Sequence, residues 1–183
     1  MTNGLRQSKT FQDIFIGMAI AFTLSVSVQQ MFHRPEEPVV IEKQVIVKVP
    51  VYLNKQDKKQ IKCLAENAYF EAGNQTTKGK IAVTNVVMNR VNDPKERYGK
   101  TPCAVVSQKT RGTCQFSWKC APAKIQSNQQ FAEAKNVAEQ VYLGNYGDVT
   151  GGATFYHANY VNPNWNLHKI KKIGTHIFYK EEI

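Results

Sequence analysis

An uncharged stretch near the amino terminus limits how much of this 183-residue chain can form a folded core. No charged side chain occurs from Ile14 to Phe32. A helix of this length would rise about 28 Å, close to the roughly 30 Å hydrocarbon core of a membrane. We therefore predict that residues 1–34 form a signal-anchor or transmembrane segment. The folded domain is then confined to residues 57–183, which can bury about two-thirds of their unfolded surface.

The residues around this stretch predict its orientation and leave its processing open. Arg6 and Lys9 precede it, and basic residues beside a membrane segment favour the cytoplasmic side. The rest of the chain is then exported, anchored in the inner membrane with its domain in the periplasm or cell wall space. The strongly apolar part ends near Val28 and contains Ser25 and Ser27. A cleaved signal peptide is therefore one alternative, and a buried core helix is another.

Residues 35–56 are predicted to form an extended tether between the membrane segment and the domain. Pro35, Pro38 and Pro50 are incompatible with a helix through this region. Val45 to Leu53 alternate between β-branched or apolar and other residues, so this part could add an edge strand to the domain. A disordered stalk is the alternative.

The cysteines are consistent with export. All four, Cys63, Cys103, Cys114 and Cys120, lie in the predicted domain, and an even number of cysteines pairs outside the cytoplasm. The alternative is a cytosolic zinc site, but the chain has no C-x-x-C pair and its cysteine spacings match no common zinc pattern. We predict a Cys114–Cys120 bond across a short loop and a Cys63–Cys103 bond, although the spacing alone leaves the connectivity open.

The hydrophobic periodicity of the domain changes from helical to strand-like along the chain. Apolar residues first recur at spacings of three and four, and Gly73 and Gly144 follow two of these segments as stop signals. Residues 114–120 form a predicted hairpin or loop, and residues 158–172 an aromatic, Asn-rich loop. The predicted helices span about 58–72, 78–91, 101–106 and 128–143, and the predicted strands 153–157 and 176–179. The predicted fold class is α+β, mostly helical with a small β element.

Glu71 is the candidate general acid. With the apolar stripe of the first helix centred near Ile61, Glu71 borders the core and Glu66 points to water. Glu71 lies in the last helical turn, where the dipole disfavours a negative charge, and its neighbours Tyr69 and Phe70 provide little solvation. Both effects raise the pKa of a carboxyl group, and a protonated carboxyl near neutral pH can protonate a glycosidic oxygen. The alternative is a solvated glutamate at a helix end.

Several separated motifs resemble one known family. In chain order they are Tyr69-Phe70-Glu71-Ala72, Gly79-x-Ile81-Ala82-Val83-x-x-Val86-Val87-x-Asn89-Arg90-Val91, Cys114-Gln115-Phe116-Ser117-Trp118, Tyr156-His157-Ala158, Tyr160-Val161-x-Pro163-x-Trp165 and Ile173-Gly174-x-His176-x-Phe178-Tyr179. They resemble the SleB-like cell wall hydrolases, the spore-cortex-lytic enzyme type, over most of residues 61–179. The resemblance implies a lysozyme-like catalytic domain that acts on peptidoglycan, with Glu71 as its catalytic acid and no cofactor.

One departure from the family pattern bears on the reaction. The family commonly has Glu-Ala-Arg-Gly-Glu, whereas this chain has Glu71-Ala72-Gly73-Asn74-Gln75 and so lacks the second glutamate. A single acid is sufficient for a lytic transglycosylase, which cleaves between N-acetylmuramic acid and N-acetylglucosamine without using water. We therefore predict this reaction. If a second carboxylate is needed, Asp148 is the first candidate.

Two polar-aromatic blocks are candidates for substrate contact, because aromatic rings and hydrogen-bonding groups together suit N-acetylated sugars. The candidates are Gln115, Phe116, Ser117 and Trp118 in the first block and Tyr156, His157 and Tyr160 in the second. Phe116 and Trp118 could instead be core residues, and His157 could be satisfied by the backbone.

Two competing functions arise from the histidines and the charge. His157, His168 and His176 could form a zinc-dependent N-acetylmuramoyl-L-alanine amidase, but they are spread over predicted loop and strand and lack the spacing of zinc ligands. We predict no metal site. The net charge of +10 would also suit a non-enzymatic wall-binding or nucleic-acid-binding module. Because the basic residues are dispersed and accompany no nucleic-acid-binding motif, the predicted partners are peptidoglycan and, through residues 14–32, the inner membrane, with no nucleic acid.

Overall fold

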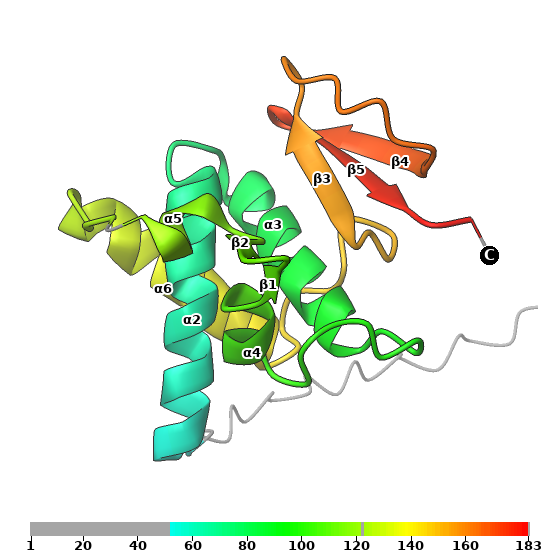
Figure 1. Ribbon diagram of the computed structural model, residues 1–183. Coiled ribbons are helices and arrows are strands. Elements are labelled where there is room, and N and C mark those ends of the chain that lie inside the picture. Colours follow the sequence, from blue (N-terminus) through cyan, green and yellow to red (C-terminus); the bar gives the residue numbers. More distant parts are fainter. Residues whose placement is uncertain (1–51, 122, 183) are drawn as a thin grey trace, which may run out of the picture. The chain divides into compact units, whose positions relative to one another are not determined.

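Three long helices form the helical layer of the domain (Figure 1). The computed structural model describes residues 52–121 and 123–182. The helices are α2 (Lys55–Ala72), α3 (Thr77–Val91) and α6 (Asn128–Tyr142). All three helices pack against one another, and α2 makes the most extensive contacts with the other helices.

Each long helix begins at a capping side chain that the sequence provides. Asn54 and Asp57 form a reciprocal capping box at the start of α2. The hydroxyl of Thr76 accepts the N–H of Gly79 at the start of α3, and Ser127 caps α6 in the same way. Such caps satisfy backbone donors that have no partner within the helix. They explain why the predicted helix boundaries agree with the observed ones to within a few residues.

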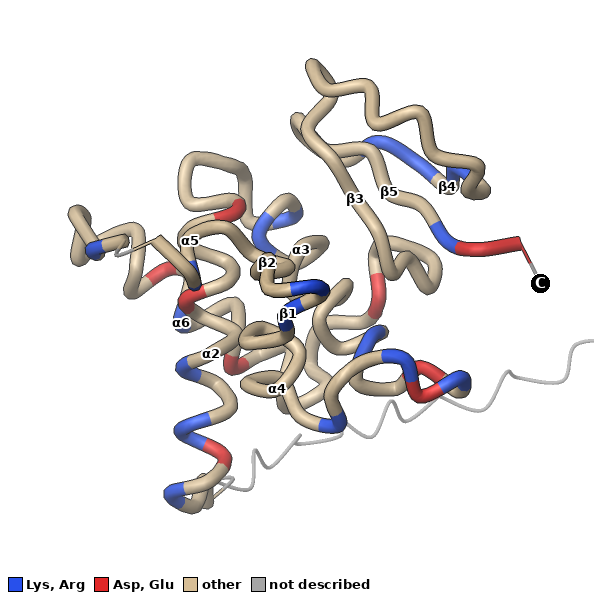
Figure 2. The backbone as a smooth tube through the Cα atoms, in the orientation of Figure 1, with Lys and Arg blue, Asp and Glu red and all other residues tan. Residues whose placement is uncertain are grey.

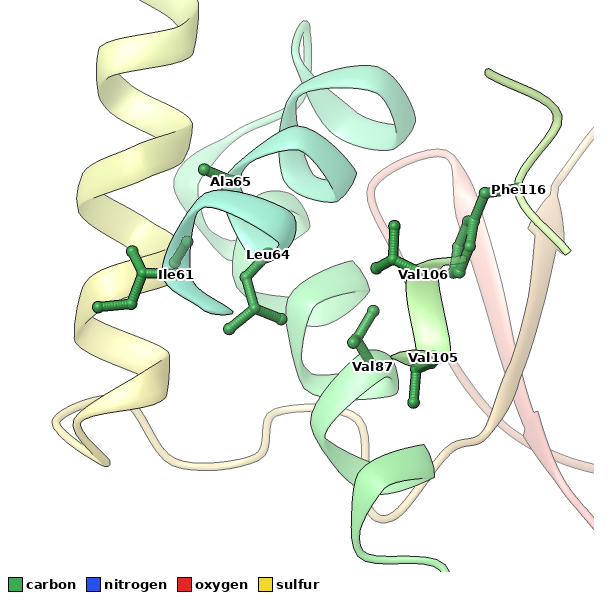
Figure 3. Close-up of a cluster of buried hydrophobic side chains, with 8 residues drawn as sticks. Ile61, Leu64, Ala65, Val87, Val105, Val106 and Phe116 are labelled. Carbon is green, nitrogen blue, oxygen red and sulfur yellow. The ribbon is translucent and has the colours of Figure 1, made fainter. Parts of the chain in front are cut away.

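The main core lies between α2, α3 and the short helix α4 (Pro102–Val106), as Figure 3 shows. Ile61, Leu64 and Val87 are among its buried members, together with Val105 and Val106. A second cluster joins α2 and α3 to the sheet, with Phe178 as its largest buried side chain. The two clusters place the end of α2 between the helical layer and the sheet.

The carboxyl-terminal part forms a three-stranded antiparallel sheet in the order β3-β5-β4. Its strands are β3 (Phe155–Ala158), β4 (His168–Ile173) and β5 (His176–Lys180). The α+β prediction is confirmed, but the prediction of a loop at 158–172 is wrong for its last five residues, 168–172, because β4 occupies them. A β-bulge between Lys169 and Lys171 interrupts the alternation of this strand, which is why the sequence pattern does not reveal it.

A short hairpin and a short helix complete the domain. The hairpin consists of β1 (Lys109–Thr110) and β2 (Thr113–Cys114), and α5 (Ser117–Cys120) follows it. Gly112 has a φ of +83° in the hairpin turn, a conformation that glycine adopts at little cost. The predicted hairpin or loop therefore contains a helical turn that the sequence analysis missed.

Both predicted disulfides are confirmed. Cys63–Cys103 joins α2 to α4, and Cys114–Cys120 closes the segment that contains α5. The cysteines are therefore not available as zinc ligands, and the cytosolic zinc site considered for them is wrong.

The predicted membrane segment at 14–32 lies outside the described residues, as do residues 35–51 of the predicted tether. The extended tether predicted up to residue 56 is too long, because Asn54 caps α2 and Lys55 and Gln56 already belong to this helix. Within residues 52–121 and 123–182, no helix combines the length and apolar character that a membrane span requires.

Candidate active site

Glu71 lies in the last turn of α2, where an indole group from a distant part of the chain reaches it. The Nε1 of Trp118 donates a hydrogen bond of 3.0 Å to the Oε1 of Glu71. The indole ring also stacks on Phe70, with 4.8 Å between the ring centroids. Because Trp118 belongs to α5, the Cys114–Cys120 bond closes the segment that carries this contact. The geometry therefore fixes one oxygen of the carboxyl group.

Burial raises the pKa of Glu71 above its ordinary value of 4.5. The nearby hydroxyl of Tyr156, the N–H of Trp118 and the positive charge of Arg90 act in the opposite direction but do not cancel this effect. The buried Tyr156 hydroxyl faces the carboxyl group, yet it makes no hydrogen bond of standard geometry within the described part of the chain. The raised pKa has the predicted direction, and its main cause is burial.

Two cavities meet at Glu71. The larger, of about 640 Å³, lies beside the end of α2 and the segment before α6, and the smaller, of about 330 Å³, lies between β2, α5 and β3. Glu71 is the one residue that lines both. The larger cavity is also lined by Tyr69, Phe70, Gly73, Asn74, Ala123, Lys124, Gln126 and Gln130. The smaller is also lined by Arg90, Cys114, Gln115, Phe116, Ser117, Phe155, Tyr156 and Trp165.

Five of the predicted substrate-contact residues lie around Glu71. Gln115, Phe116, Ser117 and Tyr156 line the smaller cavity, and Trp118 bonds to the carboxyl group itself. Phe116 is also a core residue, with only 4% of its surface exposed. The backbone of the Cys114–Cys120 segment therefore presents exposed polar side chains at positions 115 and 117 and a buried aromatic anchor between them.

His157 and Tyr160 are not brought to Glu71. Both ring nitrogens of His157 are occupied, one by the carbonyl of Ala158 and the other by the hydroxyl of Tyr179, each at 2.9 Å. Because neighbouring residues of a strand point to opposite faces, His157 lies on the face of β3 opposite to Tyr156. Tyr160 is 86% exposed and lines neither cavity.

The prediction that Glu66 points to water is wrong. Only 20% of its side chain is exposed, and it lies between the amino groups of Lys62 at 3.9 Å and Lys119 at 3.5 Å. The helical periodicity indicates only which side of α2 is apolar, and the prediction assumes that the other sides are exposed. In the structure, α5 also covers the side of α2 that carries Glu66.

Asp148, the candidate second carboxylate, organises a loop and lines neither cavity of Glu71. It accepts hydrogen bonds from the backbone N–H groups of Thr150 and Gly152 and from the side chain of Asn89. Burial raises the pKa of Asp148, but these bonds outweigh that effect and lower it below its ordinary value. The carboxylate is therefore held in its charged form by the loop.

Gln75, at the position of the missing glutamate, connects the loop after α2 to the sheet. Its Oε1 accepts the N–H of Thr175, in the turn between β4 and β5, at 3.2 Å. A Cβ atom on the neighbouring Gly174 would lie only 2.6 Å from the same oxygen. Gln75 lines neither cavity, so the contact it makes is structural.

The three histidines of the amidase alternative do not converge. His168 is exposed at the start of β4, whereas His176 is buried in β5. Among residues 52–121 and 123–182, no three His, Cys, Asp or Glu side chains are grouped so that they could hold a metal ion.

Sequence reasoning missed Arg90 and Trp165 as residues of the smaller cavity. Arg90 is 7% exposed, donates to the carbonyl of Thr154 at 2.8 Å and lies over the ring of Phe116. A signal for Arg90 was present, because it follows Val83 and Val86 on the buried face of α3, where an unpartnered charge is costly. Trp165 lies in a loop whose position has no periodic signal.

A partly buried carboxyl group with a raised pKa beside open cavities is the arrangement that a general acid requires. The model of the family described as cell wall hydrolase matches residues 74–179. The chain therefore belongs to the cell wall hydrolase family, a class of enzymes that degrade peptidoglycan. The matched range begins at Asn74, just after Glu71.

Two solved structures are similar to this domain. The crystal structure of the catalytic domain of the Bacillus cereus SleB protein is 26% identical, with a TM-score of 0.54, and the match covers 72% of this chain and 95% of that chain. The catalytic domain of the germination-specific lytic transglycosylase SleB from Bacillus anthracis is 25% identical, with a TM-score of 0.56, and the match covers 72% of this chain and 100% of that chain. Comparison with curated proteins finds no match.

Proposed function

We propose that this protein is a lytic transglycosylase that cleaves the glycan strand between N-acetylmuramic acid and N-acetylglucosamine, with Glu71 as its single acid and base. The observation that carries the proposal is that, among residues 52–121 and 123–182, Glu71 is the only carboxylate that lines the two cavities. Hydrolytic glycosidases usually place two carboxylates around the bond. A glycosidic bond bound across these cavities would face a single carboxyl group, that of Glu71.

One carboxyl group can serve both halves of this reaction. In the first half, protonated Glu71 donates its proton to the glycosidic oxygen as the bond from that oxygen to C1 of muramic acid breaks. The acetamido group of the substrate stabilises the positive charge at C1. In the second half, the 6-hydroxyl oxygen of the same sugar bonds to C1 and its proton passes to the Glu71 carboxylate. The products are a free 4-hydroxyl and a 1,6-anhydro end, and the acid is regenerated without water.

The surroundings of Glu71 support both protonation states. Burial raises its pKa and so favours the protonated form that starts the reaction. The indole N–H of Trp118 and the positive charge of Arg90 stabilise the carboxylate that remains after the proton is donated. A hydrogen bond to a charged group is worth about 1.5–3 kcal/mol, more than one between neutral groups. Gln115 and Ser117 are exposed at the smaller cavity, where they could bond to acetamido and hydroxyl groups of the sugar.

The proposal includes an exported enzyme held at the inner membrane. Residues 14–32 form the anchor, residues 35–53 the tether, and residues 54–183, which begin with the cap of α2, the catalytic domain. The two disulfides support export, because such bonds persist outside the reducing cytoplasm.

Product analysis tests the reaction. Digestion of purified peptidoglycan is expected to release muropeptides with 1,6-anhydromuramic acid ends, at a rate that EDTA does not change. Reducing muramic acid ends would identify a hydrolytic muramidase and contradict the single-carboxylate argument. Free stem peptides with intact glycan strands would identify an amidase and contradict glycan cleavage altogether.

A further inference from the structure

The outer face of the three-stranded sheet carries an aromatic cluster that reaches the smaller cavity. Trp165 packs against Phe155, His157 and Tyr179, with ring centroids 6.0, 5.4 and 5.9 Å away. Trp165 and Phe155 also line the smaller cavity together with Glu71. Trp165 remains 42% exposed. The cluster therefore forms a continuous surface from the candidate catalytic residue to the sheet.

Two lysines lie at the far edge of this face. Lys169 pairs with Tyr179, and Lys172 pairs with Ile177, across β4 and β5. Directly paired residues of antiparallel strands share a face, so both lysines lie on the same face as the aromatic cluster. Figure 2 shows the basic colour along β4. Both lysines are exposed.

No ion pair within the described part of the chain involves Lys169 or Lys172. The nearby carboxylate of Glu181 pairs instead with Lys95 and Arg97. The outer face thus combines an aromatic surface with two positive charges that pair with no carboxylate of residues 52–121 and 123–182, a combination that suits an amphipathic anionic ligand.

We propose that this outer face binds the carboxylates of the peptide stems carried by muramic acid, a proposal that rests on the glycan strand occupying the cavities at Glu71. The stem leaves the muramic acid next to the scissile bond. An extended peptide covers about 3.3 Å per residue and neighbouring strands lie about 4.8 Å apart. A stem of a few residues is therefore long enough to cross the sheet from Trp165 to β4. The protein should therefore bind glycan that carries peptide stems more tightly than glycan without them.

Edge-strand lysines also have a purely protective role in many proteins, because they discourage pairing with another chain. That role makes a different prediction: replacing Lys169 and Lys172 would promote aggregation and leave ligand binding unchanged. The two explanations are therefore separable by measuring binding and oligomeric state together.

The test measures binding of the full chain carrying Glu71→Gln, so that cleavage does not consume the ligand. The Glu71→Gln chain also carries Lys169→Gln/Lys172→Gln in the sheet variant. In the control variant of equal charge it carries Lys55→Gln/Lys59→Gln at the start of α2. The ligands are insoluble peptidoglycan with its stems, the same glycan after an amidase has removed the stems, and walls that retain anionic accessory polymers.

The sheet variant is expected to bind stem-bearing peptidoglycan about fivefold more weakly than the control, the scale of two exposed ion pairs. The two variants should bind stem-free glycan equally. An equal loss on stem-free glycan, a loss confined to walls with accessory polymers, or aggregation with unchanged binding would each overturn the proposal. Because binding is measured without turnover, these results are independent of which bond the active enzyme cuts.

Discussion

Replacing Glu71 by Gln tests the central assignment most directly. The amide keeps the volume of the side chain and an oxygen that can accept the hydrogen bond from Trp118, but it cannot donate a proton to a glycosidic oxygen. General acid catalysis contributes about 10²- to 10⁴-fold in rate. Since no other carboxylate of the described residues lines either cavity, we expect no neighbour to replace the lost acid. We expect the rate of muropeptide release to fall at least about 100-fold, or roughly 2.7 kcal/mol in activation free energy.

The same substitution has a predicted effect on stability that differs in sign from its effect on activity. Because burial raises the pKa of Glu71 above 4.5, the native state binds more protons than the unfolded state between the two pKa values. The free energy of unfolding then falls as pH rises through this range. Because Gln cannot ionise, the free energy of unfolding of the variant does not fall with pH for this reason. Urea unfolding at a series of pH values should show the variant gaining stability relative to the parent above the ordinary pKa of Glu.

The matched control is Glu66→Gln on the same helix. It removes surface ion pairs with Lys62 and Lys119, worth up to about 1 kcal/mol of stability, and should leave most of the activity. Near-normal lytic activity of Glu71→Gln, with unchanged folding, would refute the assignment of the acid. Equal losses in both variants would show that the assay reports damage to α2 and not acid catalysis.

Two further predictions concern the residues that hold this carboxyl group. Trp118→Phe keeps an aromatic ring to stack on Phe70 but removes the N–H bonded to Glu71. Because that bond lowers the pKa of Glu71, the alkaline limb of the pH–rate profile should move to higher pH, and an unchanged limb would contradict the role of the indole. Cys114→Ser/Cys120→Ser opens the segment that carries Trp118, so activity should fall. Thermal stability should fall less, because a loop this short restricts the unfolded chain less than a long one does. Equal activity of the parent and the variant, measured at equal folded fraction, would show that the disulfide is not needed to position the indole.

The helical part of the fold was predictable because its signals are local. The caps at Asn54, Thr76 and Ser127 each act within one helical turn, and the apolar periodicity between them identifies the buried faces. β4 was not predictable, because its bulge at Lys169–Lys171 breaks the period of two and its lysines resemble a solvated loop. α5 is too short to form by itself, so it depends on the Cys114–Cys120 bond around it.

The site was predictable only as far as α2 determines it. The position of Glu71 at the border of the apolar stripe follows from helix geometry. The contact with Trp118 joins residues 47 apart in sequence, and no local pattern specifies it. Likewise, His157 and Tyr156 are adjacent in sequence but face opposite sides of β3, and only the packing of Phe178 in the core determines which side faces Glu71.

The bond between Gln75 and the turn at Thr175 has a consequence for how such sequences diverge. The oxygen of residue 75 is the part that the turn uses, and a carboxylate could accept the same N–H as an amide does. Exchange between Glu and Gln at this position then keeps the contact with the turn and loses only the exposed bond from the Gln75 amide to Asn74. A glutamate at position 75 is therefore a poor marker of reaction type. Gly174, with a φ of +57° and no space for a Cβ beside that oxygen, is the other half of the contact. Positions 75 and 174 should therefore covary as one inherited unit. A side chain at 174 needs both a residue type that tolerates the positive φ and a residue 75 too short to reach the turn.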